Sequence, residues 1–173
     1  MLDDMYLLSD QVKNELKDPT QFVKKLESTS SFQKALGFSD EAILGFYEAA
    51  KSLLEQKRYS DAGNAFFFLS QLAPQVKAFW LGMARSEYLN GSVEQAIPLY
   101  VAALAFDDGD KEVYLECVRC CLSAQKYEEA IQILDMALSY TEKHPDEPQS
   151  LDLYDTSVEC KNWIISQYRA GAS

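Results

Sequence analysis

The sequence predicts an all-α protein built from stacked pairs of helices. Only seven Gly and five Pro occur among the 173 residues, which favours long helices over a turn-rich β fold. Three segments, 59–62, 93–96 and 127–130, align without a gap, and each ends in alanine. With 47% hydrophobic residues, the chain has enough apolar material for one continuous core.

The three aligned alanines, Ala62, Ala96 and Ala130, define a constant period of 34 residues, which is the period of the tetratricopeptide repeat. The repeats that they define are 43–76, 77–110 and 111–144. Large residues stand at the fourth position of each repeat, namely Phe46, Trp80 and Tyr114, and smaller ones at the eighth, namely Ala50, Ala84 and Val118. Small side chains let two helices approach closely, and large ones fill the gap to the next repeat. The predicted architecture is a right-handed α-solenoid of three helix pairs.

Residues 1–42 are predicted to form a helical extension that precedes the repeats. A short amphipathic helix is expected over 2–17, and Pro19 ends it because proline cannot continue a helix. A second short helix is expected over about 19–27, followed by a loop over 28–31. The apolar residues of the first helix are Leu2, Tyr6, Leu7, Val12 and Leu16.

A proline-bounded break over 144–148 follows the repeats, and residues 149–169 are predicted to form one further helix. Its apolar residues are Leu153, Val158, Trp163, Ile164 and Tyr168. Because a repeat stack needs an end with one polar face, we expect this helix to cap the stack.

A binding surface is predicted on the first helix of each repeat, whose second, fifth, ninth and twelfth positions line the concave side of a tetratricopeptide stack. The predicted peptide-binding residues are Leu44, Tyr47, Lys51, Leu54, Leu81, Arg85, Tyr88, Leu115, Arg119 and Leu122. The fifth and twelfth positions form two rows of aromatic and aliphatic side chains, and exposed apolar rows usually mark a binding site. Alternatively, the chain's own N-terminal segment or a second copy of the chain could cover these rows.

The ninth position carries one cation in each repeat, Lys51, Arg85 and Arg119, although the chain has 27 acidic and 16 basic residues. One interpretation is that these cations bind carbonyls or carboxylates of an extended peptide. The other is that each cation pairs with a Glu or Asp of a neighbouring helix, since surface ion pairs are common. The sequence leaves both interpretations open.

Composition argues against several classes of partner. The net charge of −11 argues against nucleic acid, whose binding proteins display a basic face, and against an anionic membrane surface. No apolar run approaches the roughly 18 residues of a membrane span. The acidic start, Met1–Asp4, is unlike a secretory signal, so we expect a cytosolic chain with no membrane insertion.

Residues for catalysis are scarce, so we predict that the chain is not an enzyme and uses no cofactor. The one histidine, His144, lies in the proline-bounded break with no predicted partner. Cys117 and Cys121 fall on core positions, and a zinc site would need two further ligands at a matching spacing. The sequence contains no GxxxxGK[ST], GxGxxG or HExxH motif.

One well-known use of three such repeats is a carboxylate clamp that holds the acidic C-terminus of cytosolic heat-shock chaperones. That clamp needs Lys, Asn and Arg at five defined positions, which here hold Tyr47, Lys51, Gly82, Glu112 and Glu116. Two glutamates would repel the carboxylates of the ligand. The sequence therefore excludes this clamp.

The segments 71–74, 79–84 and 100–104 resemble the first-to-second repeat region of the class II chaperones of bacterial type III secretion, the LcrH/SycD family. The order of an N-terminal extension, three consecutive repeats and a single C-terminal helix is also similar to that family. The resemblance covers roughly residues 35–145.

This resemblance implies an ATP-independent bacterial chaperone in the cytosol. It would hold an extended segment of a secreted substrate, a translocator or gatekeeper protein, in the concave groove and keep it soluble and ready for export. Tyr47 and Tyr88 would carry recognition, with Leu81 and Leu115 as a supporting wall. Members commonly dimerise, so residues 1–42 would be the self-association segment of a homodimer. The alternative is a general tetratricopeptide adaptor that assembles folded partners.

Overall fold

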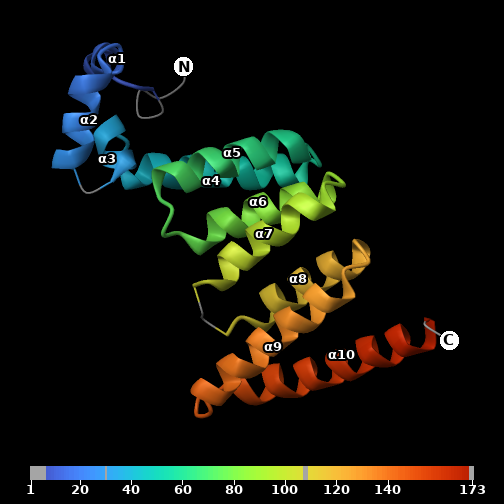
Figure 1. Cartoon of the computed structure of the whole chain (residues 1–173). Coiled ribbons are helices and arrows are strands. Elements are labelled where there is room, and N and C mark those ends of the chain that lie inside the picture. Colours follow the sequence, from blue (N-terminus) through green and yellow to red (C-terminus); the bar gives the residue numbers. More distant parts are fainter. Residues whose placement is uncertain (1–6, 30, 107–108, 172–173) are drawn as a thin grey trace. The chain divides into compact units, whose positions relative to one another are not determined.

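A computed structural model describes residues 7–29, 31–106 and 109–171, with side chains apart from those of Pro19 and 168–171. These residues form ten α-helices and no β-strand (Figure 1), which confirms the predicted all-α fold. The chain divides into two compact units, 1–83 and 84–173, and each is described by itself. None of the described helices has the length and apolar character of a transmembrane span.

The first helix, α1 (Asp10–Glu15), is shorter than the helix predicted over 2–17. Ser9 has an extended backbone, and its hydroxyl oxygen accepts a hydrogen bond from the Val12 amide, so the helix starts only after this cap. Leu7 precedes the cap and is exposed. The predicted apolar residues Leu2 and Tyr6 lie outside the described residues.

Two further helices complete the N-terminal segment. In α2 (Pro19–Ser28), Asp18 caps the first turn and proline holds the first helical position, close to the prediction. The five-residue helix α3 (Phe32–Leu36) was not predicted, because so short an element has no visible periodicity. Both ends of α3 are capped. The Ser31 hydroxyl accepts a hydrogen bond from the Lys34 amide, and Gly37 ends the helix with a φ of 77°.

The main helices of the first unit are α4 (Asp40–Glu55), α5 (Tyr59–Leu72) and the first part of α6 (Lys77–Leu89). Ser39 caps α4 through the amide of Ala42. Ala50 and Ala62 have no exposed surface, in agreement with a close approach of α4 and α5.

Gly82 in α6 leaves room for the ring of Phe66, which is almost fully buried. A Cβ added to Gly82 would lie 2.3 Å from the Phe66 ring, far inside van der Waals contact. The fit between these two residues therefore depends on glycine.

The second unit contains the rest of α6, then α7 (Val93–Leu104), α8 (Lys111–Ser123), α9 (Tyr127–Lys143) and α10 (Ser150–Gly171). Helices adjacent in sequence from α7 to α10 pack on one another (Figure 1). Pro98 lies inside α7. The fully buried small residues of this core are Ala84, Ala96, Ala103, Ala130 and Ala137.

The connection between α9 and α10 is more ordered than the sequence predicts. The ring of His144 stacks on Tyr140 with centroids 4.5 Å apart, and its Nδ1 lies 3.4 Å from a Glu147 carboxylate oxygen. The expectation that His144 has no partner is therefore wrong. The reason is that the Pro-bounded segment turns back on the last turn of α9, a contact that sequence spacing does not reveal.

We expect Gly82→Ala to destabilise the protein, although alanine normally stabilises a helix by about 1 kcal/mol relative to glycine. The added methyl group would meet the buried Phe66 ring, and such overpacking costs about 1–3 kcal/mol. Urea unfolding measures the change. With Phe66→Leu already in place, the same substitution should cost less, and an equal loss in both backgrounds would contradict the contact.

Candidate peptide-binding face

The predicted site residues of the first unit lie on α4 and the first part of α6. Leu44 is exposed, and Tyr47, Lys51 and Leu54 are half-buried, as a binding surface requires. Leu81 differs, because only 9% of its surface is exposed and it belongs to the core. The predicted role of Leu81 in the groove wall is therefore corrected, since α6 turns this position inward.

Tyr47 is held in place by other rings. Its ring centroid lies 6.1 Å from that of Phe66 and 5.7 Å from that of Phe79, both of which are buried. The Lys51 ammonium lies 5.4 Å from the Tyr47 centroid, within cation–π range. These contacts orient a half-exposed aromatic ring before any ligand arrives.

Lys51 is also paired within its own helix. Its Nζ lies 3.1 Å from a Glu48 carboxylate oxygen, and the hydrogen bond to Glu48 raises the pKa of Lys51. Because both side chains are well exposed, this pair is screened by water and remains free to rearrange.

In the second unit, the predicted site residues lie on α6 and α8. Leu115 and Leu122 are half-buried, and so is Tyr88. The Tyr88 hydroxyl lies 3.2 Å from the Ser123 hydroxyl, which itself donates to the carbonyl oxygen of Arg119. The single proton of Ser123 is thus used, so Tyr88 is the donor to Ser123 and its ring is fixed between α6 and α8.

Arg85 forms a two-point ion pair with Glu116 of α8. Its Nε and Nη2 atoms each lie 2.8 Å from one of the two carboxylate oxygens. This bidentate geometry is the strong form of such a pair, and hydrogen bonding to Glu116 raises the pKa of Arg85. Burial, and then the charge of Glu116, raise the pKa of the neighbouring Tyr100 above its ordinary range.

The three cations at the ninth positions therefore have different roles. Arg85 pairs with a neighbouring helix, as one of the two interpretations requires, whereas Lys51 pairs with its own helix. Arg119 is exposed, and in the described part of the chain its guanidinium has no ion-pair or hydrogen-bond partner. Arg119 is thus the cation best placed to meet a ligand.

Sequence reasoning missed two residues that shape this surface. It treated Glu116 only as an obstacle to a carboxylate clamp, although Glu116 neutralises Arg85, and it did not consider Ser123, which orients Tyr88. Both stand one position after predicted site residues, at the sixth and thirteenth positions of the repeat. A pairing between the ninth position of one repeat and the sixth of the next could have been sought from the register.

The residues that remain after this comparison are called here the first-helix face. They are Leu44, Tyr47, Lys51, Leu54, Arg85, Tyr88, Leu115, Arg119 and Leu122. In each unit they combine partly exposed apolar or aromatic side chains with a cation. Such a surface can bind apolar side chains of a polypeptide and donate hydrogen bonds to its oxygen atoms.

The thiols of α8 are poorly suited to chemistry. Cys117, Cys120 and Cys121 are fully buried. Burial raises the pKa of Cys120 to about 11, and a hydrogen bond with Cys121 together with burial raises the pKa of Cys117. The hydrogen bond with Cys117 lowers the pKa of Cys121, but burial keeps all three thiols from solvent. A thiol that stays protonated, as Cys117 and Cys120 do, is a weak nucleophile and a weak metal ligand. Among the described residues, no group of three or more His, Cys, Asp or Glu side chains could hold a metal ion.

Comparisons with known proteins agree with this fold. Residues 87–151 match the family model of the tetratricopeptide repeat, and no curated protein sequence matches the chain. A chain in the crystal structure of a T3SS complex from Aeromonas hydrophila is 15% identical, with a TM-score of 0.69 over 87% of this chain and 98% of that one.

The Yersinia enterocolitica type III secretion translocator chaperone SycD is 19% identical, with a TM-score of 0.63 over 78% of this chain and 98% of that one. This chain has the fold of that chaperone. The SycD chain in the crystal structure of its complex with a peptide of the translocator YopD is 20% identical to this chain. Its TM-score is 0.61 over 75% of this chain and 97% of that one. The predicted tetratricopeptide fold is confirmed.

We expect Arg85→Gln to lower the free energy of unfolding by about 1 kcal/mol, because it leaves Glu116 without its partner; the figure allows for the exposure of the pair. Arg119→Gln makes the same chemical change at an exposed arginine that has no ion pair with any described residue, so it should change stability by less than about 0.5 kcal/mol. Urea unfolding of both variants provides the comparison. Equal losses would show that the Arg85–Glu116 pair does not stabilise the second unit.

Proposed function

We propose that this chain is an ATP-independent chaperone of a bacterial type III secretion system and works in the cytosol. It binds an extended segment of a secreted substrate, a translocator or gatekeeper protein, on the first-helix face. The observation that carries the proposal is the set of partly exposed, pre-oriented apolar and aromatic residues on α4, α6 and α8. Support comes from the shared fold with SycD, which has been solved with a peptide of a translocator.

The proposed mechanism is the masking of apolar side chains. An unfolded substrate with exposed apolar segments aggregates through those segments, and a chaperone that covers them prevents this. Tyr47 and Tyr88 suit the task, because their rings are already fixed by neighbouring rings and by Ser123. A pre-oriented aromatic side chain loses little conformational entropy on binding.

Arg119 would supply polar recognition within the same site. An unpaired guanidinium can donate charge-assisted hydrogen bonds to backbone carbonyls or to a carboxylate of the substrate. Arg85 contributes differently, since Glu116 already neutralises it and the pair instead holds α6 against α8. No covalent step is involved, so release requires only a competing partner.

We also propose that residues 1–42 mediate self-association into a homodimer. This segment exposes Leu16, the C-cap of α1, together with Val23 of α2 and Phe32 of α3. Apolar side chains exposed on three successive short helices suit an interface better than an isolated surface position. A segment with this role would also leave the first-helix face available to the substrate.

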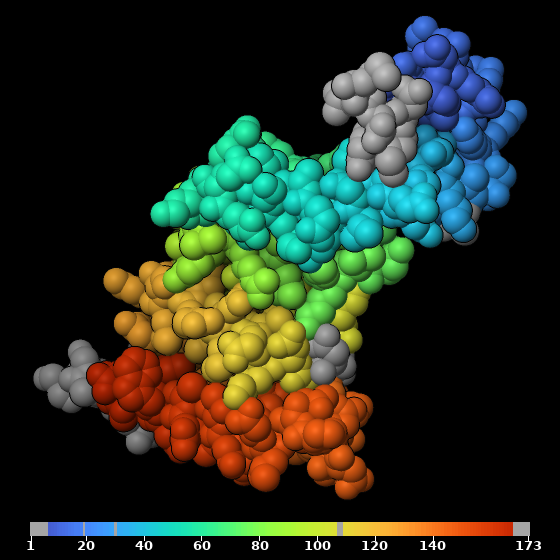
Figure 2. Space-filling view, turned by 180° about the vertical axis from the view of Figure 1, so that it is seen from behind, coloured from blue at the N-terminus to red at the C-terminus, as the bar shows by residue number. Residues whose placement is uncertain are grey.

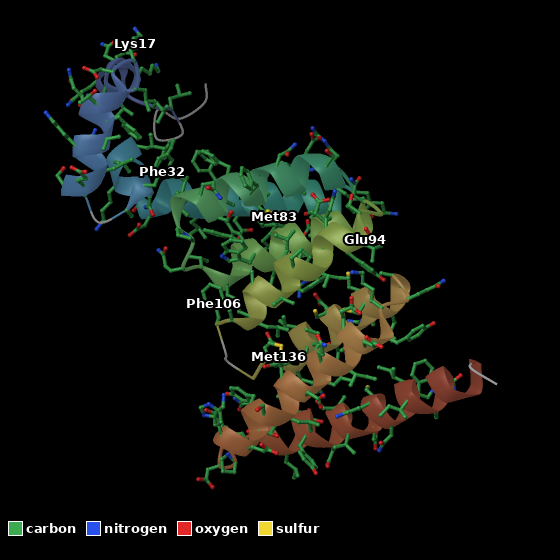
Figure 3. All side chains as sticks on the ribbon, viewed as in Figure 1. Lys17, Phe32, Met83, Glu94, Phe106 and Met136 are labelled. Carbon is green, nitrogen blue, oxygen red and sulfur yellow. The ribbon has the colours of Figure 1, made fainter. Side chains whose placement is uncertain are left out.

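Co-expression with secreted proteins encoded beside this chain tests the proposed chaperone function. We expect the chain to keep its substrate soluble, and Tyr47→Ala or Tyr88→Ala to weaken binding of a substrate peptide at least tenfold, as expected when a central aromatic contact of about 2 kcal/mol is lost. The matched control is Met136→Ala. Met136 is an exposed apolar residue on α9, the second helix of the third repeat, and so lies outside the first-helix face (Figure 3).

Circular dichroism should show that each of these variants still folds. Substrate solubility that is unaffected by both tyrosine substitutions would contradict the first-helix face as the binding site. Binding to folded partners only, with no affinity for extended peptides, would instead favour the adaptor function.

A further inference from the structure

The last helix, α10, has the burial pattern of a first helix of a repeat. Leu153 and Ser157 are each 1% exposed and lie four residues apart, as do Tyr114 and Val118, the buried fourth- and eighth-position residues of α8. Aligning these pairs makes Ser150 the first position of a fourth, offset repeat helix. The sequence predicted a capping helix here, because a repeat stack needs an end with one polar face.

This alignment gives α10 an apolar row at the positions that bind ligand on a first helix. Leu151, Tyr154 and Val158 fall at its second, fifth and ninth positions. Leu151 is 72% exposed and Tyr154 is 47% exposed, so this row lies at the surface. On α8, the equivalent fifth and ninth positions hold Leu115 and Arg119 of the first-helix face.

Side chains of α8 and α9 both meet the first turns of α10 in the second unit, and the row itself borders the last turn of α9. The Lys111 ammonium at the start of α8 lies 2.5 Å from a carboxylate oxygen of Asp152 in the first turn of α10. In Figure 2 the yellow to gold surface of α8 adjoins the red surface of α10. Beside the row is a shallow depression lined by Thr141, Glu142, Pro145, Ser150, Leu151 and Tyr154.

The charges that border the row identify the kind of partner. Asp155 and Glu159 are exposed on one flank of the row, and neither has a cation partner within the described residues. Two nearby lysines are already paired: Lys111 of α8 with Asp152 of α10, and Lys161 of α10 with Asp135 of α9. The row is therefore bordered by uncompensated negative charge.

The proposed homodimer forms through residues 1–42, so a second copy is assigned to that segment and not to this row. A polypeptide segment that places lysine or arginine beside its apolar residues fits both features. Its apolar side chains would cover Leu151, Tyr154 and Val158, and its cations would pair with Asp155 and Glu159.

We propose that α10 is a further peptide-binding helix, which binds a segment of the substrate that combines apolar residues with lysine or arginine. This inference rests on the proposed function and adds α10 to the surfaces that bind the substrate. The helix would then both end the stack and select substrate segments by their charge.

Fluorescence anisotropy with the full chain and three labelled peptides tests the proposal. One peptide alternates Leu with Lys, the second alternates Leu with Glu, and the third alternates Ser with Lys. We expect the Leu–Lys peptide to bind at least tenfold more tightly than the other two. Tyr154→Ala should weaken it about tenfold, and Asp155→Lys should weaken it most at low salt.

Two matched controls separate the site from general effects. Phe67→Ala removes an exposed aromatic residue of α5, a helix of the other unit, and it should leave binding unchanged. Glu128→Lys changes the net charge as much as Asp155→Lys, but at an exposed position on α9, and should have little effect.

The pattern of losses distinguishes this inference from the proposed function. If Tyr88→Ala weakens the peptide and the α10 variants do not, the inference is overturned and the first-helix face stands. If neither Tyr88→Ala nor the α10 variants weaken binding of the peptide, both the inference and the first-helix face as a binding site are overturned. In analytical ultracentrifugation, the contrary result is a dimer that Tyr154→Ala dissociates. That result would assign the row to a second copy and would also overturn the inference.

Discussion

The structure depends on the close approach of paired helices at positions where only small side chains fit. Ala50 and Ala62 in the first unit, and Ala84, Ala96 and Ala130 in the second, have no exposed surface. A larger residue at such a position would overpack the contact, at a typical cost of 1–3 kcal/mol. Because these alanines fix how the helices face one another, they also decide which residues of each first helix remain at the surface.

The same constraint explains how far the sequence could be interpreted. The 34-residue spacing of Ala62, Ala96 and Ala130 predicts helix pairs and the positions of partly exposed side chains such as Tyr47 and Tyr88. It could not predict α3, whose five residues show no period, nor the start of α1, which a single serine cap determines. Leu81 was misplaced because the repeat register gives average directions, whereas burial depends on the neighbours of each position.

Electrostatic pairing was also beyond the reach of spacing alone. The sequence shows a cation at each ninth position, but the partners of those cations depend on side-chain reach across helices. Arg85 forms an ion pair with Glu116 and Lys51 forms one with Glu48, whereas Arg119 has no partner among the described residues. Of these three cations, Arg119 is therefore the one that can offer its guanidinium to ligand oxygen atoms.

The central claim is that the first helices carry the binding site. Amide chemical-shift mapping of the isotope-labelled full chain, titrated with a peptide of the substrate that co-expression identifies, tests it most directly. The account predicts that the largest shifts fall on α4, α6 and α8, around Tyr47, Tyr88 and Arg119. Shifts confined to the second helices α5, α7 and α9 would contradict it.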